Sequence, residues 1–97
     1  MTFEWDEEKR QATLNKRGLD FADAERIFSG PILTKHDTRK DYGEDRYITL
    51  GALLGRPVLI VHTPRGDAVR IISMRKANEE EKAVYWEQAG AAGQYER

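Results

Sequence analysis

The pattern of apolar and polar residues predicts a β-sheet in the second half of the chain. Residues 68–76 are rich in β-branched and apolar side chains, which favour a strand inside a sheet. The same segment carries Arg70, Arg75 and Lys76, which are cations that resist burial unless something pairs them. Such a strand indicates a sheet surface that holds anions, so we expect the function to depend on where these arginines point.

Three more strands and two turns are predicted around this segment. Residues 58–61 are continuously apolar, as in a strand that is covered on both faces. Residues 46–51 alternate, so that Arg46 shares a face with Ile48 while Tyr47 points the other way. The predicted strands are 32–36, 46–51, 58–61 and 68–76, with turns at 51–57 and 64–67.

Capping patterns predict three helices. Asp6 is a good N-cap residue, and Gly18 suits the position just beyond a helix end. Asp20 caps a second, short helix, and Asn78 forms a capping box with Glu81 for a third. The predicted helices are 7–17, 21–28 and 79–88.

This order, α-α-β-β-β-β-α, predicts an α+β fold. Consecutive strands joined by short turns favour an antiparallel four-stranded meander with the helices packed on one face. A length of 97 residues favours a single domain, which we place at residues 1–89. A flexible tail is expected at residues 90–97.

The composition narrows the class of protein. The absence of cysteine excludes disulfides, thiolate zinc sites and a cysteine nucleophile. No apolar run approaches the ~20 residues that span a bilayer, and no signal segment opens the chain, so we expect a cytoplasmic protein without membrane contact. Only two histidines are present, and P-loop, G-x-G-x-x-G and H-E-x-x-H motifs are absent, so no metal or cofactor is expected.

The net charge is −1, but the basic and acidic residues are unevenly distributed along the chain. Residues 46–76 contain six Lys or Arg residues against one acid, whereas residues 77–97 contain two bases against five acids. A basic middle between acidic flanks fits a polyanion-binding face on a neutral protein. The alternative is that these charges are solvated strand edges and turns.

Four arginines of the basic middle are candidates for an RNA site. Guanidinium groups match phosphate oxygens in pairs and stabilise the charge that builds at phosphorus during in-line attack. His62, at the end of its strand, is a candidate for proton transfer, and the RNA's own 2′-hydroxyl would attack without a metal. The candidate arginines, expected to converge on one patch of the meander, are Arg46, Arg65, Arg70 and Arg75.

Alternation creates one difficulty for this patch. Arg70 and Arg75 are five residues apart, so a regular strand would place them on opposite faces. Either a β-bulge near Ser73 or a strand that ends before Arg75 is required to bring them together.

Each candidate also has a purely structural interpretation. Arg46 pairs with Glu44 or Asp45 on an edge strand in that case. Arg65 is then an ordinary turn residue, and His62 is a histidine that is hydrogen-bonded within the sheet.

Taken together, the motifs of this chain resemble the BrnT toxin family over about residues 3–86. Two positions depart from the family pattern: Arg17 replaces a usual histidine, and Met74 stands where alanine is favoured. The similarity is carried by Phe3-Glu4-Trp5-Asp6, Lys9, Asn15, Lys16-Arg17-Gly18, Phe21, Ala24, Phe28, Gly43-Glu44, Arg46, Gly51, Val61-His62-Thr63, Arg65, Arg70 to Arg75, Ala77, Glu81 and Tyr85.

The resemblance implies a compact RelE-like fold and a ribonuclease toxin of a type II toxin–antitoxin pair. It also implies a BrnA-like antitoxin, whose ribbon-helix-helix domain binds operator DNA, so that the toxin meets DNA only through its partner. The four arginines carry over as RNA-site residues, with His62 and Lys16 beside them. Arg17 and Lys76 are further predicted RNA contacts.

The leading hypothesis is therefore a metal-independent endoribonuclease that cuts mRNA, inhibits translation and growth, and is neutralised by its antitoxin. The alternative is a non-catalytic binding module that acts with a DNA-binding antitoxin as a transcriptional co-repressor. A metabolic enzyme is a third class, which the lack of a recognisable cofactor motif disfavours.

Overall fold

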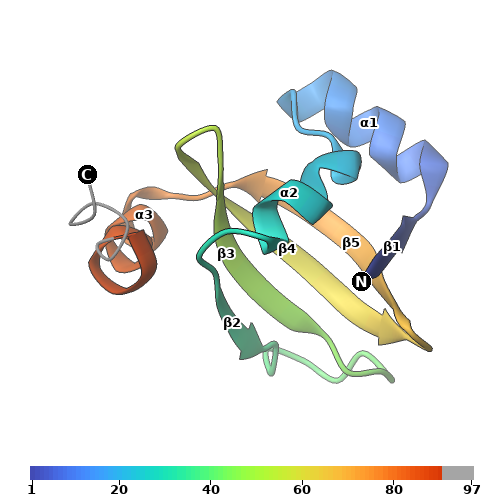
Figure 1. The fold of residues 1–97 in the computed structure, drawn as a ribbon. Coiled ribbons are helices and arrows are strands. Elements are labelled where there is room, and N and C mark those ends of the chain that lie inside the picture. Colours follow the sequence, from blue (N-terminus) through green and yellow to red (C-terminus); the bar gives the residue numbers. More distant parts are fainter. Residues whose placement is uncertain (91–97) are drawn as a thin grey trace.

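The computed structural model describes residues 1–90 and shows an α+β domain built on one five-stranded mixed sheet (Figure 1). The strands lie in the order β1-β5-β4-β3-β2. The predicted flexible tail lies outside the described residues from residue 91 onward. The elements are β1 (Thr2–Trp5), α1 (Glu7–Arg17), η1 (Phe21–Asp23), α2 (Ala24–Phe28), β2 (Leu33–His36), β3 (Tyr47–Leu53), β4 (Arg56–Arg65), β5 (Ala68–Lys76), α3 (Glu79–Tyr85) and the π-helical turn η2 (Trp86–Gly90).

The α+β class is confirmed, but the predicted four-stranded antiparallel meander is wrong. The first strand, β1, precedes α1 and pairs in parallel with β5, from Thr2 opposite Ala68 to Trp5 opposite Ile71. The other neighbouring pairs are antiparallel, as the prediction has them. Phe3 and Trp5 pack against the hydrophobic core, so burial of two aromatic side chains holds this short strand on the sheet edge.

The predicted first helix is confirmed at both ends. The Asp6 carboxylate accepts hydrogen bonds from the amides of Glu8 and Lys9, and Gly18 ends α1 with a φ of 68°. The second predicted helix divides into a 3-10 turn and the short helix α2. The third begins at its predicted capping box, although regular α-helix ends at Tyr85 and a π-helical turn follows.

The central hairpin is longer than predicted. Its strands continue to Leu53 and from Arg56, which leaves a two-residue turn in place of the predicted turn at 51–57. Leu54 and Gly55 have φ values of 52° and 80°, which is the arrangement that a tight primed turn requires. β4 likewise runs on to Arg65, so the predicted turn at 64–67 is also shorter than expected.

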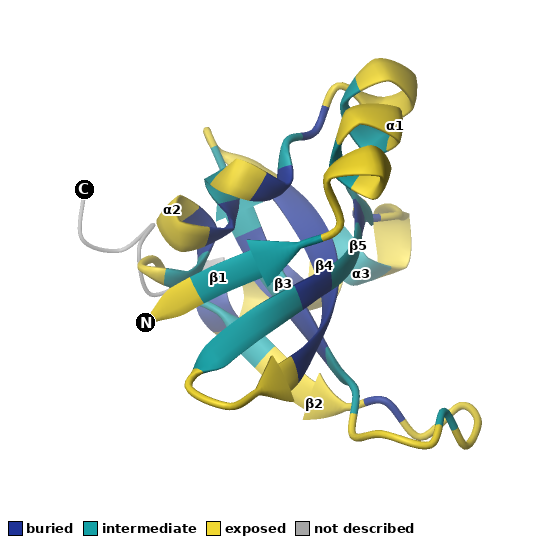
Figure 2. Ribbon diagram, turned by 90° about the vertical axis from the view of Figure 1, so that its right-hand side faces the viewer, coloured by how far each residue is buried: buried dark blue, intermediate teal, exposed yellow. Residues whose placement is uncertain are grey.

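The two faces of the sheet carry different clusters. One face, here called the α2 face, packs against η1 and α2 and contains most of the fully buried side chains. The ribbon coloured by burial shows that the central strand β4 is mostly buried, whereas α1 is mostly exposed (Figure 2). The opposite face, here called the open face, carries a smaller apolar cluster. The α2-face core consists of Leu19, Phe21, Ala24, Ile27, Val58, Ile60, Ile71 and Met74, and the open-face cluster of Ile48, Leu59 and Val61 with Leu50 and Ile72.

The expectation that all helices pack on one face is wrong. α3 stands apart from α1 and α2 (Figure 1), and its Val84 lines a pocket together with Ile48 and Leu59 of the open face. The Tyr85 side chain is buried, and its hydroxyl donates to the Pro31 carbonyl at 2.9 Å. α3 is therefore anchored at one end of the open face and leaves the rest of that face uncovered by helix.

No helix among residues 1–90 is long and apolar enough to cross a membrane.

Candidate functional site

A β-bulge in β5 places Arg70 and Arg75 on the same face of the sheet. Val61 pairs with Ser73 but the next residue, His62, pairs with Ile71, so one residue of β5 has no partner on β4. Ile71 and Met74, three residues apart, consequently both enter the α2-face core. The side chains of Arg70 and Arg75 then share the open face, so the predicted need for a bulge near Ser73 is confirmed.

Three of the four candidate arginines cluster at one end of the open face. The register aligns Glu4, Arg70 and Thr63 in one row across β1, β5 and β4. Continuing the register of β3 and β4 by one residue adds Arg46 to this row. Arg65 lies on the same face two residues beyond Thr63 in β4. These arginines, Arg46, Arg65 and Arg70, are called the arginine row below.

Arg75 belongs to a separate cluster. Its partner Leu59 lies four residues along β4 from Thr63, the partner of Arg70, which corresponds to about 13 Å at ~3.3 Å per residue. All four candidate arginines thus lie on one face, but Arg75 is set apart from the other three along that face. One row of three arginines and one more distant arginine share the same face.

Each of these arginines forms an ion pair with a carboxylate. Arg70 contacts Glu4 at 3.1 Å, while Glu44 lies 3.2 Å from Arg46 and 3.8 Å from Arg65. The predicted structural interpretation of Arg46, pairing with Glu44, is thus confirmed. The four arginine side chains, Arg75 included, remain 26% to 51% exposed, so solvent and ligands reach them.

The loop between β2 and β3 contacts this end of the open face. The Arg46 guanidinium lies 4.2 Å from the ring centroid of Tyr42, and the Thr63 hydroxyl donates to the carbonyl of Asp45. Asp37 is buried and accepts two hydrogen bonds of 2.8 Å from the Arg39 guanidinium, which holds the pKa of Asp37 well below its usual range. The loop is charged in sequence but ordered by these contacts.

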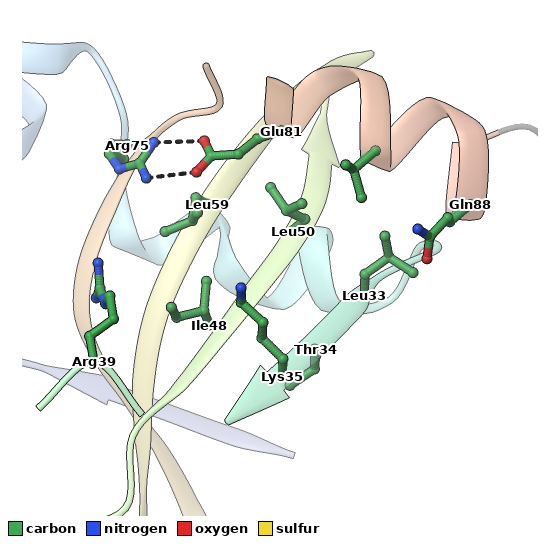
Figure 3. A pocket seen from close by; sticks show the side chains of 11 residues that line it. Leu33, Thr34, Lys35, Arg39, Ile48, Leu50, Leu59, Arg75, Glu81 and Gln88 are labelled. Carbon is green, nitrogen blue, oxygen red and sulfur yellow. Dashed lines mark hydrogen bonds and ion pairs between the residues drawn. The ribbon is translucent and has the colours of Figure 1, made fainter. Parts of the chain in front are cut away.

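A pocket of about 470 Å³ lies between this loop and α3 (Figure 3). Its floor is apolar, and Arg75 stands at its edge, joined to Glu81 of α3 by hydrogen bonds of 2.8 and 2.9 Å. The pocket is lined by Leu33, Thr34, Lys35, Arg39, Ile48, Leu50, Leu59, Arg75, Glu81, Val84 and Gln88.

Sequence reasoning missed two cations of this pocket, Lys35 and Arg39. Lys35 pairs with Ile48 in the register of β2 and β3, so alternation in a correctly paired edge strand would have identified its face. Arg39 lies in a loop without periodicity, and its place beside Arg75 depends on how that loop folds back. The Arg39 charge opposes the positive shift in the pKa of Arg75 that its hydrogen bonds to Glu81 produce.

His62 lies on the opposite face of the sheet from the candidate arginines. It lies on the α2 face, where Phe28 meets its ring edge-on at 5.2 Å and its Nε2 is 2.7 Å from the Thr49 hydroxyl. Burial lowers the pKa of His62 to about 4, so the ring is neutral at pH 7. The predicted structural alternative, a hydrogen-bonded sheet histidine, describes this position.

The remaining predicted RNA contacts lie elsewhere. The Arg17 guanidinium donates a 2.8 Å hydrogen bond to the carbonyl of Met74, on the part of β5 that β1 does not cover. Lys16 is exposed in the last turn of α1, and Lys76 is exposed at the end of β5. Contact of these three with RNA stays a prediction.

Within residues 1–90, no group of three or more histidine, cysteine, aspartate or glutamate side chains is arranged to hold a metal ion. The chemistry that the open face offers is that of guanidinium and ammonium groups beside an apolar surface. Such a surface is suited to phosphate-bearing ligands that also carry apolar parts.

The fold is a small α+β domain whose open sheet face carries the arginine row and Arg75. A family model described as "Ribonuclease toxin, BrnT, of type II toxin-antitoxin system" matches residues 5–81, and the chain belongs to this family. Comparison with curated proteins gives no match. The resemblance found in the sequence is therefore confirmed, and membership implies in general terms an RNA target and an antitoxin partner.

Proposed function

We propose that this chain is an endoribonuclease that cuts mRNA without a metal ion and uses the open face of its sheet to do so. The observation that carries the proposal is the arginine row, because Arg46, Arg65 and Arg70 present three guanidinium groups on one side of one sheet. Guanidinium groups stay charged at any working pH and pair with phosphate oxygens. The action proposed is inhibition of translation and growth in the cytoplasm, where mRNA is read.

The proposed reaction is transesterification within the RNA. The 2′-oxygen forms a bond to the adjacent phosphorus, its proton passes to water, and the bond from phosphorus to the 5′-oxygen breaks. The 5′-oxygen takes up a proton, which leaves a 2′,3′-cyclic phosphate and a 5′-hydroxyl. The arginine row stabilises the negative charge that accumulates on the phosphoryl oxygens in the transition state.

The ion pairs set the starting state of this site. Glu4 and Glu44 hold the arginine row in place before substrate arrives. When RNA binds, its phosphate would replace these carboxylates as the partner of the guanidinium groups. The proposal assigns no proton transfer to His62, because that ring lies on the other face. Positioned acid–base groups contribute about 10²–10⁴-fold to rate, so we expect a slow enzyme.

The proposed partner is a BrnA-like antitoxin with a ribbon-helix-helix domain. Its toxin-binding part would cover the open face and so block access of RNA to the arginine row. Operator DNA would be bound by the antitoxin and would not touch this chain.

The test uses the purified chain and an end-labelled single-stranded RNA with EDTA present. We expect cleavage products with cyclic phosphate ends, and no cleavage when a single 2′-deoxy substitution removes the nucleophile at the cut site. Arg70→Ala should abolish cleavage and retain the thermal unfolding transition. Intact RNA with the wild-type chain, or equal cleavage by Arg70→Ala, would reject the proposal.

One observation favours the alternative of a binding module that acts with its antitoxin as a co-repressor. All four candidate arginines are engaged by carboxylates, and the candidate proton carrier His62 is buried. A binding module would leave RNA intact in the assay above. It would still raise the affinity of the antitoxin for operator DNA.

A further inference from the structure

The pocket of about 470 Å³ between α3 and Arg39 is distinct from the arginine row. Its floor comes from the middle of the sheet, where Ile48, Leu50 and Leu59 point outward from β3 and β4 (Figure 3). A volume of this size is in the range of small-molecule sites, which run from about 300 to 1,000 Å³. The pocket therefore has room for one ligand group the size of a nucleotide.

The rim of the pocket is more basic than acidic. Lys35, Arg39 and Arg75 stand against a single lining acid, Glu81. Glu81 pairs with Arg75, and Arg39 pairs with Asp37, which lies outside the pocket lining. Lys35 forms no ion pair within residues 1–90, so its charge remains available to an anion at this rim.

We propose that this pocket binds one nucleotide of the single-stranded RNA, a short way along the strand from the bond that the arginine row addresses. The inference rests on the proposed function and adds a subsite that selects the sequence of the cut. The base would lie on the floor of Ile48, Leu50 and Leu59, and Lys35 would neutralise its phosphate.

The chemistry of a nucleotide fits this lining in three ways. The base is flat and apolar on its faces, and it can stack on a guanidinium plane such as that of Arg39 or Arg75. Its edge carries hydrogen-bonding groups, for which the Gln88 amide and the Glu81 carboxylate stand at the rim. Single-stranded RNA presents such unstacked bases, whereas a duplex does not.

The position of the pocket agrees with a nucleotide farther along the same RNA strand. Leu59 and the Arg70 partner Thr63 are four residues apart on the same strand, about 13 Å along the open face. A chain of nucleotides that passes from the arginine row toward α3 crosses Val61 and then reaches the pocket at Ile48. One continuous RNA strand can therefore occupy the arginine row and the pocket at the same time.

Val84→Trp offers a direct test, because Val84 lines the pocket from α3 and is 41% exposed. The indole fills the pocket without removing a buried side chain. Ala83→Trp is the matched control, since Ala83 is exposed on α3 and is not part of the pocket lining. Both variants are first checked for an unchanged thermal unfolding transition.

The measurement has two parts. Methyl NMR spectra of each protein are recorded with adenosine, guanosine, cytidine and uridine 3′-monophosphates, and cut sites in a random-sequence RNA pool are mapped by sequencing. We expect at least one nucleotide to shift the methyl signals of Ile48, Leu50 and Leu59 in the wild type and Ala83→Trp. Val84→Trp should weaken that binding by roughly tenfold or more and should change the bases that flank the cut.

The two proposals can fail separately. Nucleotide binding in the pocket without any cleavage by the wild type would reject the proposed nuclease and keep this subsite. Cleavage with the same base preference in Val84→Trp, and no nucleotide-induced shifts, would overturn the subsite alone. Absence of nucleotide shifts together with loss of neutralisation of Val84→Trp by the cognate antitoxin would also overturn it, because the pocket would then be a protein site.

Discussion

Arg75 and Glu81 are joined by two parallel hydrogen bonds, of 2.8 Å from Nη1 and 2.9 Å from Nη2. The same Glu81 carboxylate accepts a 2.9 Å hydrogen bond from the amide of Asn78 and so closes the capping box of α3. The hydrogen bonds raise the pKa of Arg75 and lower that of Glu81. One carboxylate therefore fixes α3 to β5 and at the same time compensates a charge at the rim of the pocket.

Replacing Glu81 by glutamine should strengthen RNA binding. Glutamine retains the capping box, because it serves at this position as glutamate does, but it carries no charge to compensate Arg75. An ion pair of this exposure is worth about 0.2–1 kcal/mol, so we expect affinity for a single-stranded RNA oligonucleotide to rise by up to about fivefold. Fluorescence anisotropy measures the change. Glu79→Gln, whose side chain is 92% exposed and pairs with Lys82, should leave affinity within error. Equal gains in both variants would point to net charge and not to Arg75.

His62 should make the fold less stable in acid. Its pKa in the folded chain is about 4, against an ordinary value of 6.5, because burial disfavours the charged ring. The unfolded chain therefore binds more protons between these values, and the free energy of unfolding falls as pH drops through this window. The stability contribution lost between pH 7 and pH 5 is about 2 kcal/mol.

Urea unfolding of the wild type and of His62→Gln at both pH values measures this contribution as a difference in the slope of the free energy of unfolding against pH. His36→Gln is the control, since His36 is exposed, and a slope unchanged by His62→Gln would contradict the assignment.

Gly51 permits α2 to approach β3. A Cβ atom at Gly51 would lie 2.5 Å from Cγ2 of Ile27, which is itself fully buried, and 3.2 Å from Cγ2 of Ile32. Gly51→Ala should therefore lower the free energy of unfolding by about 1–3 kcal/mol, as overpacking does in other cores. Gly30→Ala is the matched control, because a Cβ there meets only the Ile27 carbonyl, at 3.8 Å. Thermal unfolding of the two variants compares them, and equal transition temperatures would show that α2 shifts without cost.

Arg17 should contribute to stability through Met74. Its guanidinium donates to the Met74 carbonyl, on the part of β5 that β1 does not cover. Removing this hydrogen bond in Arg17→Ala should lower the free energy of unfolding by about 1 kcal/mol. Lys16→Ala, at the exposed neighbouring position, should change it by less than about 0.5 kcal/mol. Urea unfolding distinguishes the two, and equal stability of both variants would remove the structural role of Arg17.

Local signals in the sequence predicted the helices and the strand cores. Asp6 and Gly18 bound α1 where the capping pattern places them, and Asn78 opens α3. The residues that these caps contact lie within four positions, so the sequence contains the information directly. β5 begins and ends at its predicted residues for a related reason, because its turn and the following cap lie next to it.

Local sequence patterns do not predict contacts between residues that are far apart in the chain. β1 was missed because four residues give too short an alternation, and its partner strand lies 66 residues away. The ion pair of Arg70 with Glu4 depends on that parallel pairing. The position of Arg39 depends on how its loop folds over the open face, which the sequence pattern does not encode. The bulge was inferred only because two arginines five residues apart were expected on one face.

The proposed function requires that RNA bind the open face through the arginine row. We would compare two double variants. The first, Arg46→Ala with Arg70→Ala, removes two charges of the arginine row. The control, Lys9→Ala with Arg26→Ala, removes two charges from exposed positions of α1 and α2. Binding of a non-cleavable 2′-O-methyl RNA oligonucleotide is measured by anisotropy over a series of salt concentrations. Only the first double variant should lose affinity, and its slope of log K against log salt should become shallower by about 1.4, the value for two lost phosphate contacts. Equal losses in the two variants, or a larger loss in the second, would contradict the proposed function.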